Sequence, residues 1–157
     1  MHNDLGYMVW KSGRYRKGVK EFQAALPHFR KADILDERAN TLNNLAYVYS
    51  VLGETERAKS LVEDARQLRE ELGQEYPLAL SYNTSGEIHT VANEPEEAVA
   101  WCERARAIFS AMEDARGLGL AYIGLGRAHR KTGDKGKRGE YPFKQSQGAF
   151  GQAVECW

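Results

Sequence analysis

The sequence predicts an all-α protein built as a right-handed solenoid of antiparallel helix hairpins. The first observation is a period of forty residues, because Gly13, Gly53, Asn93 and Gly133 are evenly spaced and are residue types that tolerate a left-handed turn at a helix end. The second observation is that apolar residues recur at helical spacing between these turns. A period of roughly 20 to 50 residues is typical of solenoids, so we expect one domain over residues 1–157.

The same signals place the elements in chain order. Leu42, Leu45, Ala46 and Tyr49 lie at i, i+3, i+4 and i+7, which predicts one buried stripe of a helix that ends at Gly53. A second helix with the same spacing follows and closes an antiparallel hairpin. Repeating this unit along the chain predicts four hairpins, at about residues 2–35, 36–73, 76–113 and 116–157.

Two places depart from the regular pattern. Pro27 lies inside the second helix of the first hairpin, where proline costs about 3 kcal/mol or kinks the axis, so we expect a bend or break near Ala25. In the last hairpin a polar, glycine-rich stretch delays the second helix until Phe150, Val154 and Trp157, so that helix is either displaced or opens a further hairpin. The first helix lacks an opening turn, and we therefore expect a fragment of a larger protein.

The composition excludes several classes of function. The formal net charge is zero, which makes nucleic acid an unlikely main partner, and no apolar run approaches the roughly 20 residues of a membrane helix. The first residues lack the parts of a signal peptide, and two cysteines are too few for a disulfide framework. We expect a cytoplasmic protein with no cofactor.

Small residues recur where two helices would cross closely, at Gly6, Ala46, Gly86, Gly126, Ala58 and Ala98. The tetratricopeptide repeat family keeps these positions small, and the chain resembles that family over nearly its whole length. The usual period there is about 34 residues. The forty-residue form, with Leu42-Asn43-Asn44-Leu45-Ala46 leading to Gly53, is similar to the repeats of kinesin light chains and to the sensor arrays of bacterial signal-transducing ATPases.

A second stripe of the same helix, Asn43, Tyr47 and Ser50, lies about a quarter-turn from the packing stripe. The resemblance implies that this stripe lines a concave groove, in which asparagines hydrogen-bond the backbone of a bound peptide. An amide can both donate and accept, as backbone recognition requires. The remaining groove residues are expected to be Asn3, Tyr7, Trp10, Lys11, Asn40, Asn83, Glu87, Thr90, Arg127, Arg130 and Lys131.

We therefore expect a protein–protein interaction scaffold that holds a peptide or protein segment, with the sensor region of a signalling ATPase as one setting. Two alternatives stay open for the asparagines: they tolerate a solvated helix face, or they join neighbouring repeats. A structural spacer, or a module that self-associates through exposed solenoid ends, is the alternative function.

Other chemistry is weakly indicated. His89 and His129 are forty residues apart, but they occupy the row of Tyr49, where packing explains an aromatic ring without a metal. The basic stretch 127–144 is either a solvated loop or a site for an acidic peptide, nucleotide or nucleic acid. Glycines between 117 and 126 are expected at helix crossings, Cys102 is expected to be a buried thiol, and no catalytic constellation is visible.

Overall fold

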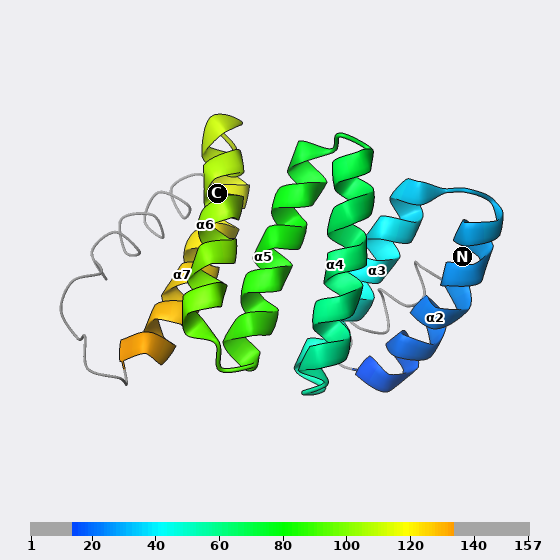
Figure 1. Cartoon of the computed structure of the whole chain (residues 1–157), viewed down its shortest axis with the longest axis horizontal. Helices are drawn as coiled ribbons and strands as arrows, with labels where there is room; N and C mark the ends of the chain where they lie inside the picture. The colour runs from blue at the N-terminus through cyan, green and yellow to red at the C-terminus, as the bar shows by residue number, and fades with distance from the viewer. Residues whose placement is uncertain (1–13, 134–157) are drawn as a thin grey trace. The chain divides into compact units, whose positions relative to one another are not determined.

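The structure, a computed structural model, describes residues 14–133, and all of its regular elements are helices (Figure 1). Each helix begins twenty residues after the one before it, so a pair of helices spans forty residues and the predicted period is confirmed. The expected all-helical repeat fold is confirmed as well. The helices are α2 (Tyr15–Lys31), α3 (Leu35–Val51), α4 (Thr55–Glu71), α5 (Glu75–Val91), α6 (Pro95–Ala111) and α7 (Ala115–Gly133).

A residue with positive φ stands between each pair of successive helices. The predicted turns at Gly53 and Asn93 are confirmed, with φ of 83° and 62°. Gly133 is the last residue of α7, and Gly13 lies outside the described residues. The same conformation also occurs at Asp33, Gly73 and Glu113, so it recurs every twenty residues. Glu113 is unexpected, because a non-glycine residue other than Asn or Asp adopts this conformation at a steric cost.

At four of the five linkers between the described helices, one residue both closes a helix and opens the next. The N–H of Glu54 donates to the carbonyl of Tyr49 at 2.9 Å, as in a Schellman motif, while its own carbonyl accepts from the N–H of Ala58. Glu94 does the same between His89 and Ala98. The linkers therefore have a fixed length of three residues, which preserves the repeat register.

The chain divides into two compact units, residues 1–74 and 75–157. In the first unit α3 and α4 form an antiparallel hairpin, and α2 packs against α3. The predicted stripe of α3 is confirmed as core, since Leu42, Leu45, Ala46 and Tyr49 are all at most 5% exposed. Phe22 supplies the main buried side chain of α2.

In the second unit α6 packs against both α5 and α7, and α5 also contacts α7. Phe109 is fully buried among Ala79, Ala105 and Ala121, and its ring meets Tyr76 edge-on with the centroids 5.6 Å apart. Small residues at these crossings leave room for one large ring.

Three helices of this unit meet at Cys102. A Cβ added at Gly86 would collide with the Sγ atom of Cys102, and one added at Gly124 would lie 2.7 Å from it. Gly117 is likewise required beneath the ring of Phe109. The expectation of glycines at helix crossings is confirmed at these three positions, whereas no described atom lies within 4 Å of a Cβ built on Gly126.

The expected break near Ala25 is wrong, because α2 runs unbroken from Tyr15 to Lys31 with Pro27 inside it. Pro27 lies near the C-terminal end, so it removes one hydrogen bond to the carbonyl of Gln23 and few residues follow it. Burial of Phe22 and Ala25 holds the helix on its unit. No helix within residues 14–133 is long and apolar enough to cross a membrane.

Candidate functional site

The first helices of two successive repeats lie side by side in the second unit, namely α5 and α7. One ion pair joins them: Nη1 of Arg127 donates to both carboxylate oxygens of Glu87 at 2.9 Å. The two residues are forty positions apart, so equivalent positions of the two repeats face each other. We call the exposed side of this helix pair, marked by Asn83, Glu87, Ile123 and Arg127, the α5–α7 face.

The ion pair positions side chains more than it stabilises the fold. The Glu87 side chain is 16% exposed and the Arg127 side chain 48% exposed. A pair with one partner in solvent contributes only about 0.2–1 kcal/mol. Its main consequence is that two long side chains on the α5–α7 face have a defined geometry.

Asn83 lies beside this pair and is half-buried. Its Oδ1 atom is buried and has no hydrogen-bond partner within the described part of the chain. A Cβ on Gly124 would lie 3.1 Å from that oxygen, so Gly124 leaves space for the amide between α5 and α7. A buried polar atom without a partner costs about 1–3 kcal/mol, so a donor that reached this oxygen would be favoured.

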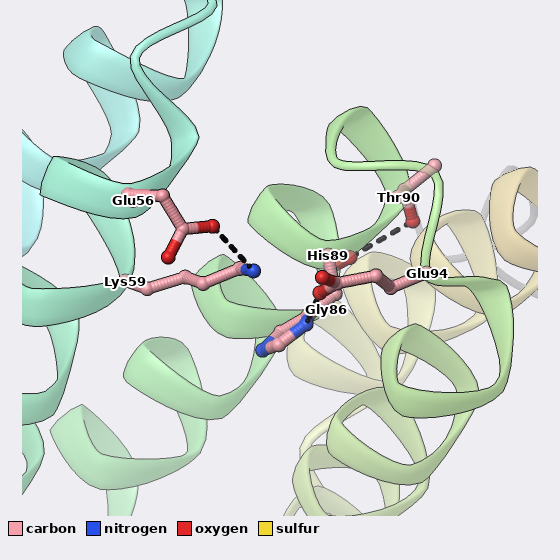
Figure 2. Close-up of polar contacts among 6 residues, drawn as sticks. All are labelled: Glu56, Lys59, Gly86, His89, Thr90 and Glu94. Carbon is pink, nitrogen blue, oxygen red and sulfur yellow. Dashed lines mark hydrogen bonds and ion pairs between the residues drawn. The ribbon is translucent and has the colours of Figure 1, made fainter.

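The end of α5 uses its polar side chains internally (Figure 2). Thr90 is buried and its hydroxyl donates to the carbonyl of Gly86 at 2.8 Å. The Nδ1 atom of His89 lies 2.6 Å from a carboxylate oxygen of Glu94. Thr90 therefore does not present its hydroxyl to a ligand in this structure.

In the first unit the predicted groove residues of α3 fall into three groups. Asn43 and Tyr47 are half-buried on the helix surface, whereas Ser50 is only 2% exposed. Oδ1 of Asn40 accepts a hydrogen bond from Nη2 of Arg69 at 2.7 Å. Asn40 thus joins α3 to α4 within one hairpin, which differs from the contact between neighbouring repeats that the alternative expected for the asparagines.

Arg69 is a buried cation, being 3% exposed. Desolvation lowers its pKa to about 10, while the negative charge of Asp36 acts in the opposite direction. The sequence did not reveal this residue, because Arg at a second-helix position commonly faces solvent. On the same helix Lys59 makes an ordinary surface ion pair with Glu56 at 2.9 Å (Figure 2).

The remaining predicted groove residues lie at the two ends of the chain. Arg130 and Lys131 are exposed in the last turn of α7. The predicted positions Asn3, Tyr7, Trp10 and Lys11 lie outside the described residues, as does most of the basic stretch 127–144.

An aromatic stack on α5 and α6 was not anticipated from the sequence. The rings of Tyr82 and Trp101 stack with centroids 5.6 Å apart, and the guanidinium of Arg104 lies 4.6 Å from the Trp101 ring. Trp101 and Arg104 are three residues apart on one helix, and that spacing was the available signal. The ring of His89 extends the stack at 6.4 Å, which accounts for an aromatic residue at this position.

The Cys102 thiol and the His129 ring are two side chains of this unit that could react, and burial disfavours the charged form of both. Cys102 is fully buried, and desolvation, reinforced by the charges of Glu87 and Glu103, raises its pKa to about 12, so its thiolate is scarce at neutral pH. Burial lowers the pKa of His129, against a smaller opposing effect of Glu103. Within residues 14–133 no three His, Cys, Asp or Glu side chains are grouped to hold a metal ion.

Comparisons with known proteins agree with the helical repeat fold. Residues 1–71 match the family model described as tetratricopeptide repeat, a scaffold class that is typically non-catalytic. No curated protein matches the sequence. Crystal structures that share the fold include BtubC (BKLC) from P. vanneervenii, with 23% sequence identity and a TM-score of 0.76 over 98% of this chain. The chain spans 61% of the length of that BtubC structure.

A protein from Podosopora anserina, described as a putative kinesin light chain with nearly identical TPR-like repeats, also shares the fold. Two of its crystal structures, one of them of a substituted form, have TM-scores of 0.70 and 0.67 at 16% identity. They align with 98% of this chain and 72% of their own length. Residues 1–71 belong to the tetratricopeptide repeat family, and the chain has the fold of its helical repeat arrays.

Proposed function

We propose that the chain is a protein–protein interaction scaffold that binds a partner protein segment on its first helices, with one candidate face on α3 of the first unit and another, the α5–α7 face, in the second unit. Proteins with these repeats generally bind other proteins. The observation that carries the proposal is the α5–α7 face itself. It combines a half-buried amide at Asn83 with the exposed apolar side chain of Ile123 and the Glu87–Arg127 pair.

The asparagines are expected to orient the bound peptide more than to increase its affinity. A net hydrogen bond contributes about 1 kcal/mol, or roughly a fivefold change in Kd. Asn43 and Asn83 alone therefore do not account for a stable complex. Apolar and aromatic side chains beside them, Ile123 and Tyr47, are the expected anchors, since large side chains dominate binding hot spots.

The contacts of the predicted groove residues support some amides as ligand contacts more than others. The Oδ1 atom of Asn40 already accepts from Arg69, and Ser50 and Thr90 are buried. Among the described asparagine-row residues we assign peptide binding to Asn83, whose Oδ1 accepts no hydrogen bond within residues 14–133, and to Asn43 by its equivalent position in the repeat. Asn3 belongs to the same row by its position in the repeat.

The cellular setting is part of the proposal. We propose a cytoplasmic protein, which the free buried thiol of Cys102 supports, and the sensor region of a signalling ATPase as its setting, which the resemblance of the long repeat supports.

The test is a titration with peptides selected on the chain from a random displayed library. Asn83→Ala and Asn43→Ala are each expected to weaken binding about fivefold. Glu97→Gln, on the exposed surface of α6, is the matched control and is expected to leave Kd unchanged. Unchanged affinity in both asparagine variants sinks the proposal. A molar mass that rises with concentration in light scattering, without peptide binding, would favour the self-association alternative.

A further inference from the structure

The positive charge of the first unit is concentrated in α2. Residues 14–31 contain six Lys or Arg and one acid, whereas residues 32–74 contain five Lys or Arg and nine acids. The net formal charge is +5 for residues 14–31 and −4 for residues 32–74. The first unit is therefore nearly neutral as a whole but contains two regions of opposite charge. All six cations of the first region are exposed: Arg14, Arg16, Lys17, Lys20, Arg30 and Lys31.

The sequence of α2 provides none of these cations with an acid three residues earlier, whereas several cations of α4 and α6 have one. In α4 and α6 a glutamate at that spacing pairs with the cation, as for Arg57 with Glu54, Lys59 with Glu56 and Arg106 with Glu103. In α2 the corresponding positions carry neutral or basic residues, including Arg14 before Lys17 and Lys17 before Lys20. Like charges at this spacing oppose helix formation.

The charges at the start of α2 also have the unfavourable sign. Its first turn holds Arg16 and Lys17 and no acid, although the N-terminal end of a helix carries partial positive charge. By contrast, Asp36 and Glu37 open α3, and Glu56 lies in the first turn of α4. Hence α2 retains two arrangements that weaken a helix and that a bound anion would relieve.

We propose that the exposed side of α2 is a second docking surface, separate from the face of the first helices, and that it binds a short acidic protein segment. The size of the charged region selects this partner. A helix of 17 residues is about 25 Å long, and the remainder of the unit is acidic. A longer polyanion would extend beyond the Debye length of about 8 Å into that acidic region.

The other anionic partners fit less well. The exposed positions of α2 include no Phe, Tyr or Trp on which unpaired bases would stack. They also include no Leu, Ile, Phe or Trp to enter a bilayer, since Phe22 is buried and Phe29 and Leu26 are partly covered. Flexible, exposed Lys and Arg side chains suit carboxylates on an extended segment.

The experiment is a fluorescence-anisotropy titration of the full chain with a labelled poly-glutamate peptide at about 0.15 M salt. Lys17→Gln/Lys20→Gln is expected to weaken binding about tenfold, and Arg30→Gln/Lys31→Gln similarly. Arg57→Gln/Lys59→Gln changes the net charge equally on α4 of the same unit, and its Kd is expected to stay within about twofold of that of the parent chain. Circular dichroism melts check folding. Lys17→Gln/Lys20→Gln is expected to melt no lower than the parent, because like-charge repulsion is removed, whereas Arg30→Gln/Lys31→Gln removes favourable charges from the last turn and is expected to melt slightly lower.

Three results would overturn the proposal. The first is an equal loss of affinity in the α2 and α4 variants, which would indicate a general charge effect. The second is binding of a DNA duplex or an anionic phosphatidylserine vesicle as tight as that of the peptide. The third is self-association that Lys17→Gln/Lys20→Gln abolishes, which would make a second copy the occupant. Asn83→Ala leaves α2 unchanged. Failure of peptide binding by the first helices can therefore be distinguished from failure of acidic-segment binding by α2.

Discussion

The hairpins α3–α4 and α5–α6 reach the same fold with different interior chemistry. At one pair of equivalent positions the first hairpin has Asn40 and the buried Arg69, joined by a hydrogen bond of 2.7 Å. The second hairpin has Leu80 and Phe109 there, within one apolar cluster. The repeat therefore fixes which two positions of a hairpin contact each other. Either a polar pair or an apolar pair can fill these two positions, provided that both residues are of the same kind.

A second pair of equivalent positions shows how closely the helices approach. Ala46 and Val62 are buried in the first hairpin, and Gly86 and Cys102 occupy the same positions in the second. A Cβ at Gly86 would collide with Sγ of Cys102. The methyl group that the first hairpin accommodates thus has no space in the second.

The largest expected effect is the loss of the Phe109 ring. Phe109→Ala removes a fully buried aromatic side chain and leaves a cavity among alanines that cannot fill it. We expect a loss of about 3–5 kcal/mol in the free energy of unfolding, measured by urea titration. A loss below about 1 kcal/mol would show that the apolar cluster does not hold the second hairpin together.

The Asn40–Arg69 pair allows the corresponding test in the first hairpin. Arg69→Ala leaves Asn40 without its partner and is expected to cost about 1–3 kcal/mol of unfolding free energy. The double variant Asn40→Leu/Arg69→Phe transplants the apolar pair of the second hairpin and should recover most of that loss, since a buried cation is replaced by packing. A double variant less stable than Arg69→Ala would contradict the equivalence of the two positions.

The close crossing predicts an effect of a single methyl group. Gly86→Ala is expected to destabilise the chain by about 1–3 kcal/mol through overpacking against Cys102, as measured by thermal or urea unfolding. Adding Cys102→Ala to the Gly86→Ala variant should restore part of the lost stability, because the colliding sulfur atom is removed. The matched control Ala46→Gly should cost only about 1 kcal/mol, through helix propensity. Equal effects of both substitutions would mean that the two crossings do not differ.

The smallest expected effect is a pH dependence. Tyr49 and His129 occupy equivalent positions, and burial lowers the pKa of His129 below its usual value near 6.5. The unfolded chain therefore takes up this proton at a higher pH than the folded chain, so stability falls as pH drops below about 6.5. Urea midpoints at pH 7 and pH 5 should fall less in His129→Tyr than in the parent chain. An equal or larger fall in the variant would oppose this assignment.

The repeat positions were readable from the sequence because they depend on spacing. The stripe from Leu42 to Tyr49 and the turns at Gly53 and Asn93 follow from apolar periodicity and from left-handed preference. Glu113 was missed at an equivalent turn because its residue type disfavours the conformation that the fold imposes.

The candidate site was less readable, because it depends on which side chains meet between helices. Asn40 and Asn43 look alike in sequence, yet only the structure shows that Arg69 uses the amide of Asn40. The opposite charges of Glu87 and Arg127, forty residues apart, were a usable signal for a contact between repeats. The break predicted from Pro27 did not occur, because the disruption that a proline causes depends on how many helical residues follow it.

Peptide binding on the α5–α7 face is tested most directly by site-specific photocrosslinking. A benzoylphenylalanine residue in place of Ile123, which is 38% exposed on α7, should crosslink a peptide selected from a displayed library. The same residue in place of the exposed Glu97 on α6 should not, and excess unlabelled peptide should suppress the crosslink at position 123. Crosslinking from position 97 but not from position 123 would contradict the account.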